Sequence, residues 1–257
     1  MNYLAIEEHI VNWLKSYLDK SGLSGFIVGI SGGIDSAVTS TLCAKTGAQV
    51  MCLNMPLRQH KADYERAQNH ILHLKSQFNN VSALEIELTD TFTSFEKCLP
   101  NDVVSDNLAM ANSRSRLRMM TLYAVGQSNK LLVAGTGNKV EDFGVGFFTK
   151  YGDGGVDLSP IADLMKTQVY ALGKHLGIIP EILEARPTDG LWEDGRSDED
   201  QIGATYPELE WAMLFNGDES SLSSREKEVL NIYRKLNRMN THKMEPIPVC
   251  LIPSMYL

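Results

Sequence analysis

Short apolar runs alternate with longer helical patterns over the first half of this 257-residue chain. Apolar residues recur at helical spacing over residues 3–18, 36–44, 63–78 and 104–127. The short runs, each a candidate strand, cover residues 26–30, 48–54, 83–88 and 130–134. Segments of these lengths suit right-handed crossovers between parallel strands. The pattern therefore predicts an α/β fold with a doubly wound, mostly parallel sheet flanked by helices, whose ligands bind at the carboxyl ends of the strands.

No internal repeat, low-complexity tract or linker divides the sequence, so we expect a single domain over residues 1–257 with a helical C-terminal extension. Two polar stretches with several glycines, residues 143–160 and 186–201, are predicted to be loops. The first of them is expected to be mobile. Long loops of this kind are usually functional or disordered.

Charge and cysteine usage exclude several classes of protein. With 24 basic and 32 acidic residues the net charge is −8, so we expect no nucleic-acid partner. No apolar run approaches the ~18 residues of a membrane span, and the first helical segment carries Glu7, Glu8 and Lys15, unlike a signal peptide. We therefore expect a cytoplasmic protein with no membrane partner. Cys43 and Cys52 lie in apolar surroundings and are predicted core residues, without a zinc site or disulfide framework.

The turn after the first candidate strand has the composition of a phosphate-binding loop. Gly29, Gly32 and Gly33 allow a sharp turn that points several backbone N–H groups toward one position. A helix N-terminus follows and would add its field. Ser31 and Ser36 add hydroxyl donors. The loop therefore favours an anionic ligand, although glycines that make only a tight turn would look the same.

Asp35, at the start of the following helix, would repel a phosphate. A Mg²⁺ ion between them would remove the conflict, because Mg²⁺ binds carboxylate and phosphate oxygens together. Asp35 could otherwise serve only as a helix cap. The loop has neither the Gly-Lys-Ser/Thr ending of a Walker loop nor a Gly-x-Gly-x-x-Gly pattern.

The run Ser-Gly-Gly-Ile-Asp-Ser at residues 31–36 resembles the diphosphate-binding loop of the ATP pyrophosphatases. That superfamily includes NAD, GMP and asparagine synthetases, has a Rossmann-like fold of the adenine nucleotide alpha hydrolase kind, and splits ATP between its α and β phosphates. The resemblance implies ATP as co-substrate and assigns to it Gly29, Ile30, Ser31, Gly32, Gly33, Ile34, Asp35 and Ser36. By itself this motif indicates only the superfamily.

The run Gly-Phe-Phe-Thr-Lys-Tyr-Gly-Asp-Gly-Gly-Val-Asp at residues 146–157 closely resembles a loop of the NAD synthetases. Its glycines suit a loop that can close, its aromatic residues can pack, and Lys150 supplies a positive charge. The resemblance implies that Lys150 and Asp157 contact deamido-NAD, the acid form of the dinucleotide.

Residues 112–119, Asn-Ser-Arg-Ser-Arg-Leu-Arg-Met, resemble the Asn-x-x-Ala-Arg-x-Arg-Met helix of the same family. The match implies that Arg116 contacts deamido-NAD. Ser115 stands where alanine is usual. Three arginines at every second residue cannot share one helix face, so Arg114 and Arg118 could instead face solvent.

Residues 133–141 follow the fourth candidate strand and offer oxygen ligands. The resemblance implies that Thr136 binds ATP and that Glu141 shares a Mg²⁺ ion with Asp35. Two carboxylates from separate loops suit Mg²⁺, whose other ligands would be phosphate and water. From its position alone, Glu141 could equally be an exposed residue at a helix start.

Three later positions complete the series. Lys166 is a candidate ATP ligand, since an ordinary lysine in the first turn of a helix would oppose the helix dipole. The resemblance assigns Thr188 to ATP, although Asp189 replaces the usual alanine. His242 and Lys243 resemble the family's His-Lys tail and would approach the nicotinate side; a lone pair of this kind would be ordinary surface.

The resemblance covers residues 29–248 in the family's order, and we expect no glutaminase domain. It implies a ligase that joins ammonia, either free or delivered by another source, to deamido-NAD through an acyl-adenylate, giving NAD, AMP and diphosphate in the last step of NAD synthesis. Asp35 and Lys166 would stabilise the departing diphosphate, and Asp157 could accept a proton from ammonium. A homodimer with the substrate site at the subunit interface is also implied.

Two other classes remain open at this point. Another ATP pyrophosphatase, GMP synthetase-like or tRNA-modifying, would need a different acceptor tail or basic patches. A non-catalytic nucleotide-binding protein would not require Asp35, Glu141, Lys150 and Lys166 together, because binding alone needs no metal carboxylates.

Overall fold

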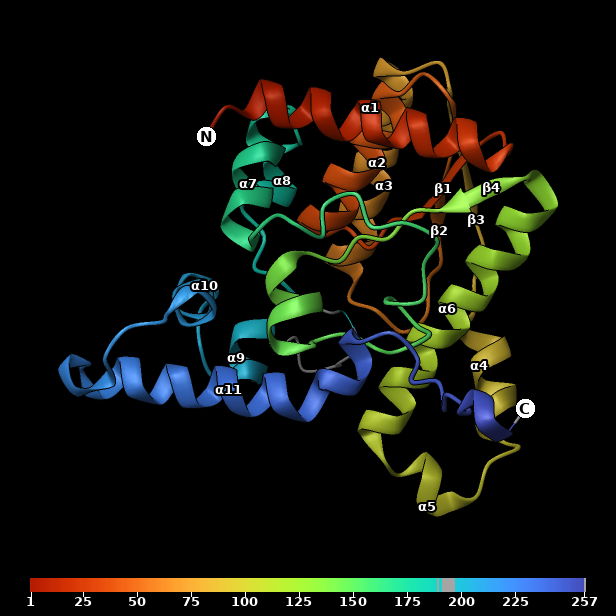
Figure 1. The fold of residues 1–257 in the computed structure, drawn as a ribbon. Helices are drawn as coiled ribbons and strands as arrows, with labels where there is room; N and C mark the ends of the chain where they lie inside the picture. The colour runs from red at the N-terminus through yellow and green to blue at the C-terminus, as the bar shows by residue number, and fades with distance from the viewer. Residues whose placement is uncertain (189, 191–196, 257) are drawn as a thin grey trace.

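A four-stranded parallel sheet forms the centre of the computed structural model, in which residues 1–188, 190 and 197–256 are described. The strand order is β3-β2-β1-β4 (Figure 1). The strands are β1 (Gly25–Gly29), β2 (Gln49–Asn54), β3 (Val81–Glu85) and β4 (Leu131–Val133). The predicted doubly wound parallel sheet is confirmed.

Helices cover both faces of this sheet. Phe26 and Val28 of β1 point toward the first face, whose helices are α1 (Tyr3–Ser21), α2 (Ile34–Lys45), α3 (Lys61–Gln77), α7 (Lys166–His175) and α8 (Pro180–Leu183). Ile27, between them, points to the second face, covered by α4 (Thr89–Glu96) and α6 (Asn107–Asn129). Neighbouring residues of one strand thus enter different cores, because side chains alternate along a strand.

Two predicted boundaries were wrong. The third strand is Val81–Glu85, not 83–88, because Ile86 and Leu88 leave the sheet edge and pack into the core of the second face. The helix expected at 104–127 is α6, which begins only at Asn107, and residue 104 ends a separate short helix, α5 (Asn101–Val104). The Asp106 carboxylate separates them, accepting hydrogen bonds from the backbone N of Leu108 and Ala109, both at 3.0 Å.

The C-terminal part is the helical extension expected from the sequence. It contains α9 (Asp198–Ile202), α10 (Tyr206–Leu214), η2 (Glu219–Ser221), α11 (Ser224–Met244) and η3 (Ser254–Tyr256). With the π-helix η1 (Lys139–Val145) it encloses a third core, which includes Val140, Leu209 and Val229. Figure 1 shows α11 at the end of the molecule opposite α1. The loop predicted at 186–201 gives way to α9 at Asp198, and its residues 189 and 191–196 lie outside the described part.

Cys43 and Cys52 are buried, as predicted, while Cys98 and Cys250 are exposed. No helix within the described ranges is long and apolar enough to cross a membrane. The cytoplasmic location and the single-domain organisation stay predictions.

Candidate functional site

One cavity of about 630 Å³ lies at the carboxyl ends of β1 and β4. All the residues predicted to bind ATP, metal or deamido-NAD line it, with the exception of Asp157. They are Gly29, Ile30, Ser31, Gly32, Gly33, Ile34, Asp35, Ser36, Arg116, Thr136, Glu141, Lys150, Lys166, Thr188, His242 and Lys243. The fold thus gathers segments from both ends of the chain, and the ligand roles of these residues remain predictions.

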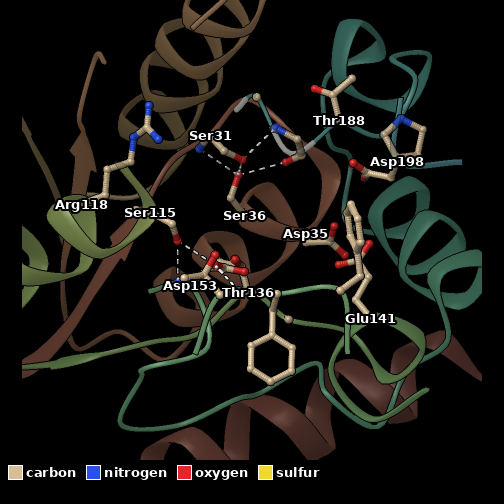
Figure 2. Close-up of a pocket in the computed structure, with 18 of the residues that line it drawn as sticks. Ser31, Asp35, Ser36, Ser115, Arg118, Thr136, Glu141, Asp153, Thr188 and Asp198 are labelled. Carbon is tan, nitrogen blue, oxygen red and sulfur yellow. Dashed lines mark hydrogen bonds between the residues drawn. The ribbon is translucent and has the colours of Figure 1, made fainter. Parts of the chain in front are cut away.

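The glycine loop is held by its own serines. The backbone N of Gly33 donates to Ser31 Oγ at 3.2 Å, and Ser36 Oγ donates to the carbonyl of Gly33 at 3.0 Å (Figure 2). No side chain caps the N-terminus of α2. The N–H groups of its first turn therefore remain to be satisfied, as an anion at this position would do.

Gly32 is required by close packing as well as by conformation. Its φ of 85° lies in the left-handed region. A Cβ atom here would clash with the carbonyl oxygen of Asp63, in the first turn of α3. Arg66 of α3 also donates from Nε to the Gly32 carbonyl, at 3.3 Å. Helix α3 thus fixes the loop from outside, a support that the sequence pattern did not indicate.

Asp35 and Glu141 converge on a single ammonium group. Lys166 Nζ lies 2.6 Å from Asp35 Oδ2 and 2.9 Å from Glu141 Oε1. Figure 2 shows the two carboxylates side by side. Lys166 is only 3% exposed, so it is not an ordinary surface lysine at a helix start. Burial by itself would lower the pKa of Lys166, but the charges of Asp35 and Glu141 outweigh burial and raise it. The lysine therefore stays charged.

Tyr206, which the sequence did not single out, completes this group from α10. Its hydroxyl donates to Glu141 Oε1 and lies 3.2 Å from Asp198 Oδ2. The ammonium of Lys166 lies 4.9 Å from the centre of its ring. Tyr206 is only 3% exposed. One buried phenol therefore ties the segment after residue 197 to the candidate metal ligand.

Glu141 belongs to a π-helix, a rare element that often marks functional sites. Two asparagines of α11 support its end. Asn237 donates to the carbonyl of Gly144 and Asn240 to that of Val145, both at 2.8 Å. These bonds satisfy carbonyl groups that a helix end leaves without partners.

The arrangement fits a hard divalent cation that shares its ligands with phosphate. Asp35 and Glu141 both reach one cationic group and offer oxygen, the ligand Mg²⁺ prefers. Over the described ranges, no group of three or more His, Cys, Asp or Glu side chains could hold a metal by itself. The remaining ligands would therefore come from phosphate and water.

Two further acidic residues, Asp142 and Asp153, line the same cavity. Burial raises the pKa of Asp142 to about 8, and the charges of Glu141, Asp153 and Asp35 add to this effect. The Asp142 carboxyl is therefore mostly protonated at neutral pH, and a bound cation would chiefly offset the charges of Asp35 and Glu141 when phosphates approach. Asp142 carried no recognisable signal in the sequence, and Asp153 lies in the run 146–157 that resembles the NAD synthetase loop but was assigned no role there.

The loop 146–157 closes the other end of the cavity, and α11 holds it. Lys243 Nζ donates to the carbonyls of Gly146 and, at 2.8 Å, Phe148. Lys150 Nζ donates to the carbonyl of His242 at 2.6 Å. Arg116 of α6 donates from Nε to the carbonyl of Lys150 at 3.2 Å. The predicted acceptor-binding cations thus form one cluster, in which Lys243 also contributes to the loop's structure.

Asp157 is placed differently from the other candidates. Its carboxylate accepts from the backbone N of Val133 at 2.8 Å and from the Tyr123 hydroxyl at 2.9 Å. Tyr17 of α1 approaches its carbonyl at 3.5 Å. These contacts lie on the face made by α1 and α6, away from the cavity lining.

The two arginines left open by the sequence do not simply face solvent. Arg118 donates from Nε to the carbonyl of Met55 at 3.2 Å and from Nη2 to that of Leu57 at 3.1 Å. The guanidinium of Arg114 lies 5.8 Å from the centre of the Phe92 ring. Arg118 therefore fixes the chain after β2, which forms one wall of the cavity.

Known proteins resemble this chain over nearly its whole length. An NH3-dependent NAD+ synthetase of Mycoplasma genitalium is 40% identical over 237 residues, which cover 91% of this chain and 92% of the relative. The NMN synthetase structure of Francisella tularensis is 31% identical, covers 99% of each chain and has a TM-score of 0.85. The NH3-dependent NAD synthetase of Campylobacter jejuni, 25% identical, covers 98% of this chain and 100% of its own, with a TM-score of 0.76. Residues 6–247 match the family described as NAD synthase. This chain therefore belongs to the NAD synthase family.

Proposed function

We propose that this chain is a ligase that amidates deamido-NAD with ammonia, using ATP and forming NAD, AMP and diphosphate. The observation that carries the proposal is the composition of one cavity. One end holds the glycine loop with Asp35, Glu141 and Lys166, and the other gathers Arg116, Lys150, His242 and Lys243. An ATP-cleaving end and a cationic acceptor end in one cavity suit the activation of an anionic substrate.

The nicotinate carboxylate is a poor electrophile, so it must be activated before ammonia can attack. Its oxygen attacks the α phosphorus of ATP, forming an acyl-adenylate and releasing diphosphate. Ammonia then attacks the carbonyl carbon, loses a proton, and displaces AMP. The glycine loop and the N-terminus of α2 would hold the diphosphate through backbone N–H groups, with Thr136 and Thr188 as further ATP contacts.

Asp35 and Glu141 would hold Mg²⁺, which would neutralise charge on the phosphates when bound. Lys166 supplies a fixed positive charge at the same position and is held there by both carboxylates. Because ATP and deamido-NAD are both anionic and repel one another, much of the protein's contribution to the rate would be to align them. The loop 146–157 lies over the acceptor end and would exclude water from the adenylate.

We further propose a homodimer in which α1 and α6 meet a second copy. Their faces expose Trp13, Tyr17 and Met120, with exposed fractions of 40%, 39% and 63%. Large apolar side chains gathered on one face favour a protein interface. Asp157 lies on this face beside Tyr17, so its predicted contact with deamido-NAD would be made at the interface. Mass measurement in solution tests this: a monomer at micromolar concentration would contradict it.

A second candidate substrate is the mononucleotide acid, favoured by the similarity to the Francisella NMN synthetase. The chemistry is the same and only the acceptor is smaller. The discriminating quantity is kcat/KM for deamido-NAD against that for nicotinate mononucleotide.

The test is an assay of the purified protein with ATP, Mg²⁺, ammonium and either acceptor. We expect NAD and AMP in equal amounts from deamido-NAD, and, with an ¹⁸O-labelled nicotinate carboxylate, one labelled oxygen in AMP. AMP formed only with another acid would identify a different ATP pyrophosphatase. Absence of AMP under all conditions would favour the non-catalytic alternative.

A further inference from the structure

Ser115 of α6 and Asp153 of the acceptor loop bind each other twice. Ser115 Oγ donates to Asp153 Oδ1 at 2.6 Å and accepts from the backbone N of Asp153 at 3.0 Å (Figure 2). The serine is 8% exposed, so water competes little for its hydroxyl. A hydroxyl that both donates to a carboxylate and accepts from the same residue's amide fixes that residue's orientation.

The same contact organises the whole turn around Lys150. Asp153 Oδ1 also accepts from the backbone N of Thr149, at 3.0 Å. Thr149 Oγ1 in turn donates to Asn112 Oδ1 of α6 at 2.6 Å. The loop segment is thus bound to two successive turns of α6, through Thr149 before Lys150 and through Asp153 after it.

The chain makes room for this contact at Gly152. A Cβ atom on that residue would clash with Ser115 Oγ, and its neighbours Thr149 and Asp153 are both in the network. Helix α11 holds a different part of the loop, through Lys243 and the carbonyls of Gly146 and Phe148. Within the turn 149–155, α11 is reached by the side chain of Lys150, which donates to the His242 carbonyl, whereas Ser115 binds the turn at Asp153.

We propose that Ser115 is a positioning residue for the acceptor: its hydroxyl holds the turn 149–155 against α6 and so fixes Lys150 beside Arg116. Arg116 Nε reaches the Lys150 carbonyl at 3.2 Å only while this turn lies on α6. The two cations then present a preformed site for an anionic nucleotide, and their ordering is completed before the substrate binds. The inference rests on the proposed function, which assigns this end of the cavity to the acceptor.

The first test is the kinetics of Ser115→Ala. Alanine suits a helix interior, so α6 should form normally. We expect KM for the acceptor to rise about tenfold, the order expected for a lost hydrogen bond to a charged group, while KM for ATP changes less than about twofold. The matched control is Ser113→Ala, since Ser113 Oγ donates only within its own helix, to the Ala109 carbonyl at 2.8 Å. Equal changes in both KM values, or none, would overturn the proposal.

A second measurement needs no turnover. Hydrogen exchange of a peptide covering residues 149–155 should be about tenfold faster in Ser115→Ala than in the wild type or Ser113→Ala. Trypsin should also cut faster after Lys150, whose neighbour Tyr151 is 61% exposed. Unchanged exchange and cleavage would refute the positioning role even if the wild type makes NAD. Faster exchange in a protein that makes no NAD would instead leave the contact established and the proposed function wrong.

Discussion

The two ends of the cavity are built in different ways. At the end that we propose binds ATP, the glycine loop follows directly from β1, and Asp35, Glu141 and Lys166 hold one another through charge contacts. At the acceptor end, the loop 146–157 meets the sheet at Asp157, whose backbone N donates to the Val133 carbonyl at 3.0 Å. The rest of the loop is held by side chains of α6 and α11 that bind its carbonyls, and by Lys150, which binds the carbonyl of His242. The first end is positioned by the sheet, the second by a few hydrogen bonds.

This difference between the two ends of the cavity indicates which end can change its ligand most easily among related proteins. A site anchored in a sheet moves only if the core moves, because packed interiors transmit strain. A loop held by single side chains can change its acceptor through a few substitutions. Similarity to an NMN synthetase as well as to NAD synthetases agrees with a constant ATP end and an adjustable acceptor end.

The largest effect is expected at the metal carboxylates. Asp35→Asn and Glu141→Gln should each lower the rate of AMP formation by at least about 100-fold, since each removes a proposed ligand of the Mg²⁺ ion that would neutralise the departing diphosphate. Circular dichroism should show the native fold. Asp163→Asn is the control: this carboxylate also pairs with a lysine of η1, Lys139 at 2.7 Å, but its side chain is 95% exposed. Normal turnover of Asp35→Asn and Glu141→Gln at ordinary Mg²⁺ concentrations would contradict the proposal that these carboxylates bind the metal. The proposed difference between the two ends of the cavity would then lose its support at this end.

Acid should lower the free energy of unfolding through His70, which lies where α3 packs against α2 beside the glycine loop. His70 of α3 is fully buried, and its Nε2 lies 2.9 Å from Ser40 Oγ in α2. Burial lowers the pKa of His70 from 6.5 to about 4, and His73 adds to this. In the unfolded chain His70 therefore binds a proton near pH 6.5, whereas in the folded chain it binds one only near pH 4. On this account the free energy of unfolding should fall by about 2 kcal/mol between pH 7 and pH 5.

Urea titrations at several pH values measure that slope. His70→Gln should flatten it, whereas His9→Gln, at an exposed position of α1, should leave it unchanged. A His70→Gln protein with the wild-type slope would show that the buried imidazole does not control acid sensitivity.

An intermediate effect is expected from Tyr206→Phe, which keeps the ring but removes the hydroxyl bound to Glu141. The Mg²⁺ concentration for half-maximal rate should rise about tenfold, as for other groups that orient a metal ligand, with most of kcat recovered at saturation. Mn²⁺ binding in the presence of ATP should weaken in parallel. Tyr233→Phe, in the same apolar core, is the control. A loss of kcat with unchanged metal dependence would count against this role.

The smallest effect should fall at the acceptor end. Lys150→Ala should raise KM for the acceptor five- to tenfold, roughly the strength of one charged contact, and leave KM for ATP within about twofold. Exposed Lys235→Ala, on α11, should change neither value. An equal rise in both KM values would mean that the two ends are not independent.

Much of the site could be predicted because the chain resembles the NAD synthetases at most of its residues, and because the glycine loop and Asp35 follow a buried strand. Lys166 was predicted as an ATP ligand, since a lysine in the first turn of a helix opposes the helix dipole. Asp142, Tyr206 and Arg66 could not be found in this way. Tyr206 and Arg66 matter through partners more than 30 residues away, as in the Tyr206–Glu141 contact.

The sequence by itself determined the parallel sheet and its helical crossovers, since side-chain periodicity decides which face of each element is buried. It also determined the glycine loop, because local backbone freedom comes from the residues that occupy it. Only the tertiary structure decided that Asp157 lies outside the cavity, that Lys166 joins Asp35 to Glu141, and that Ser115 holds the acceptor loop. Those facts depend on distances between segments far apart in the chain, and packing alone sets such distances.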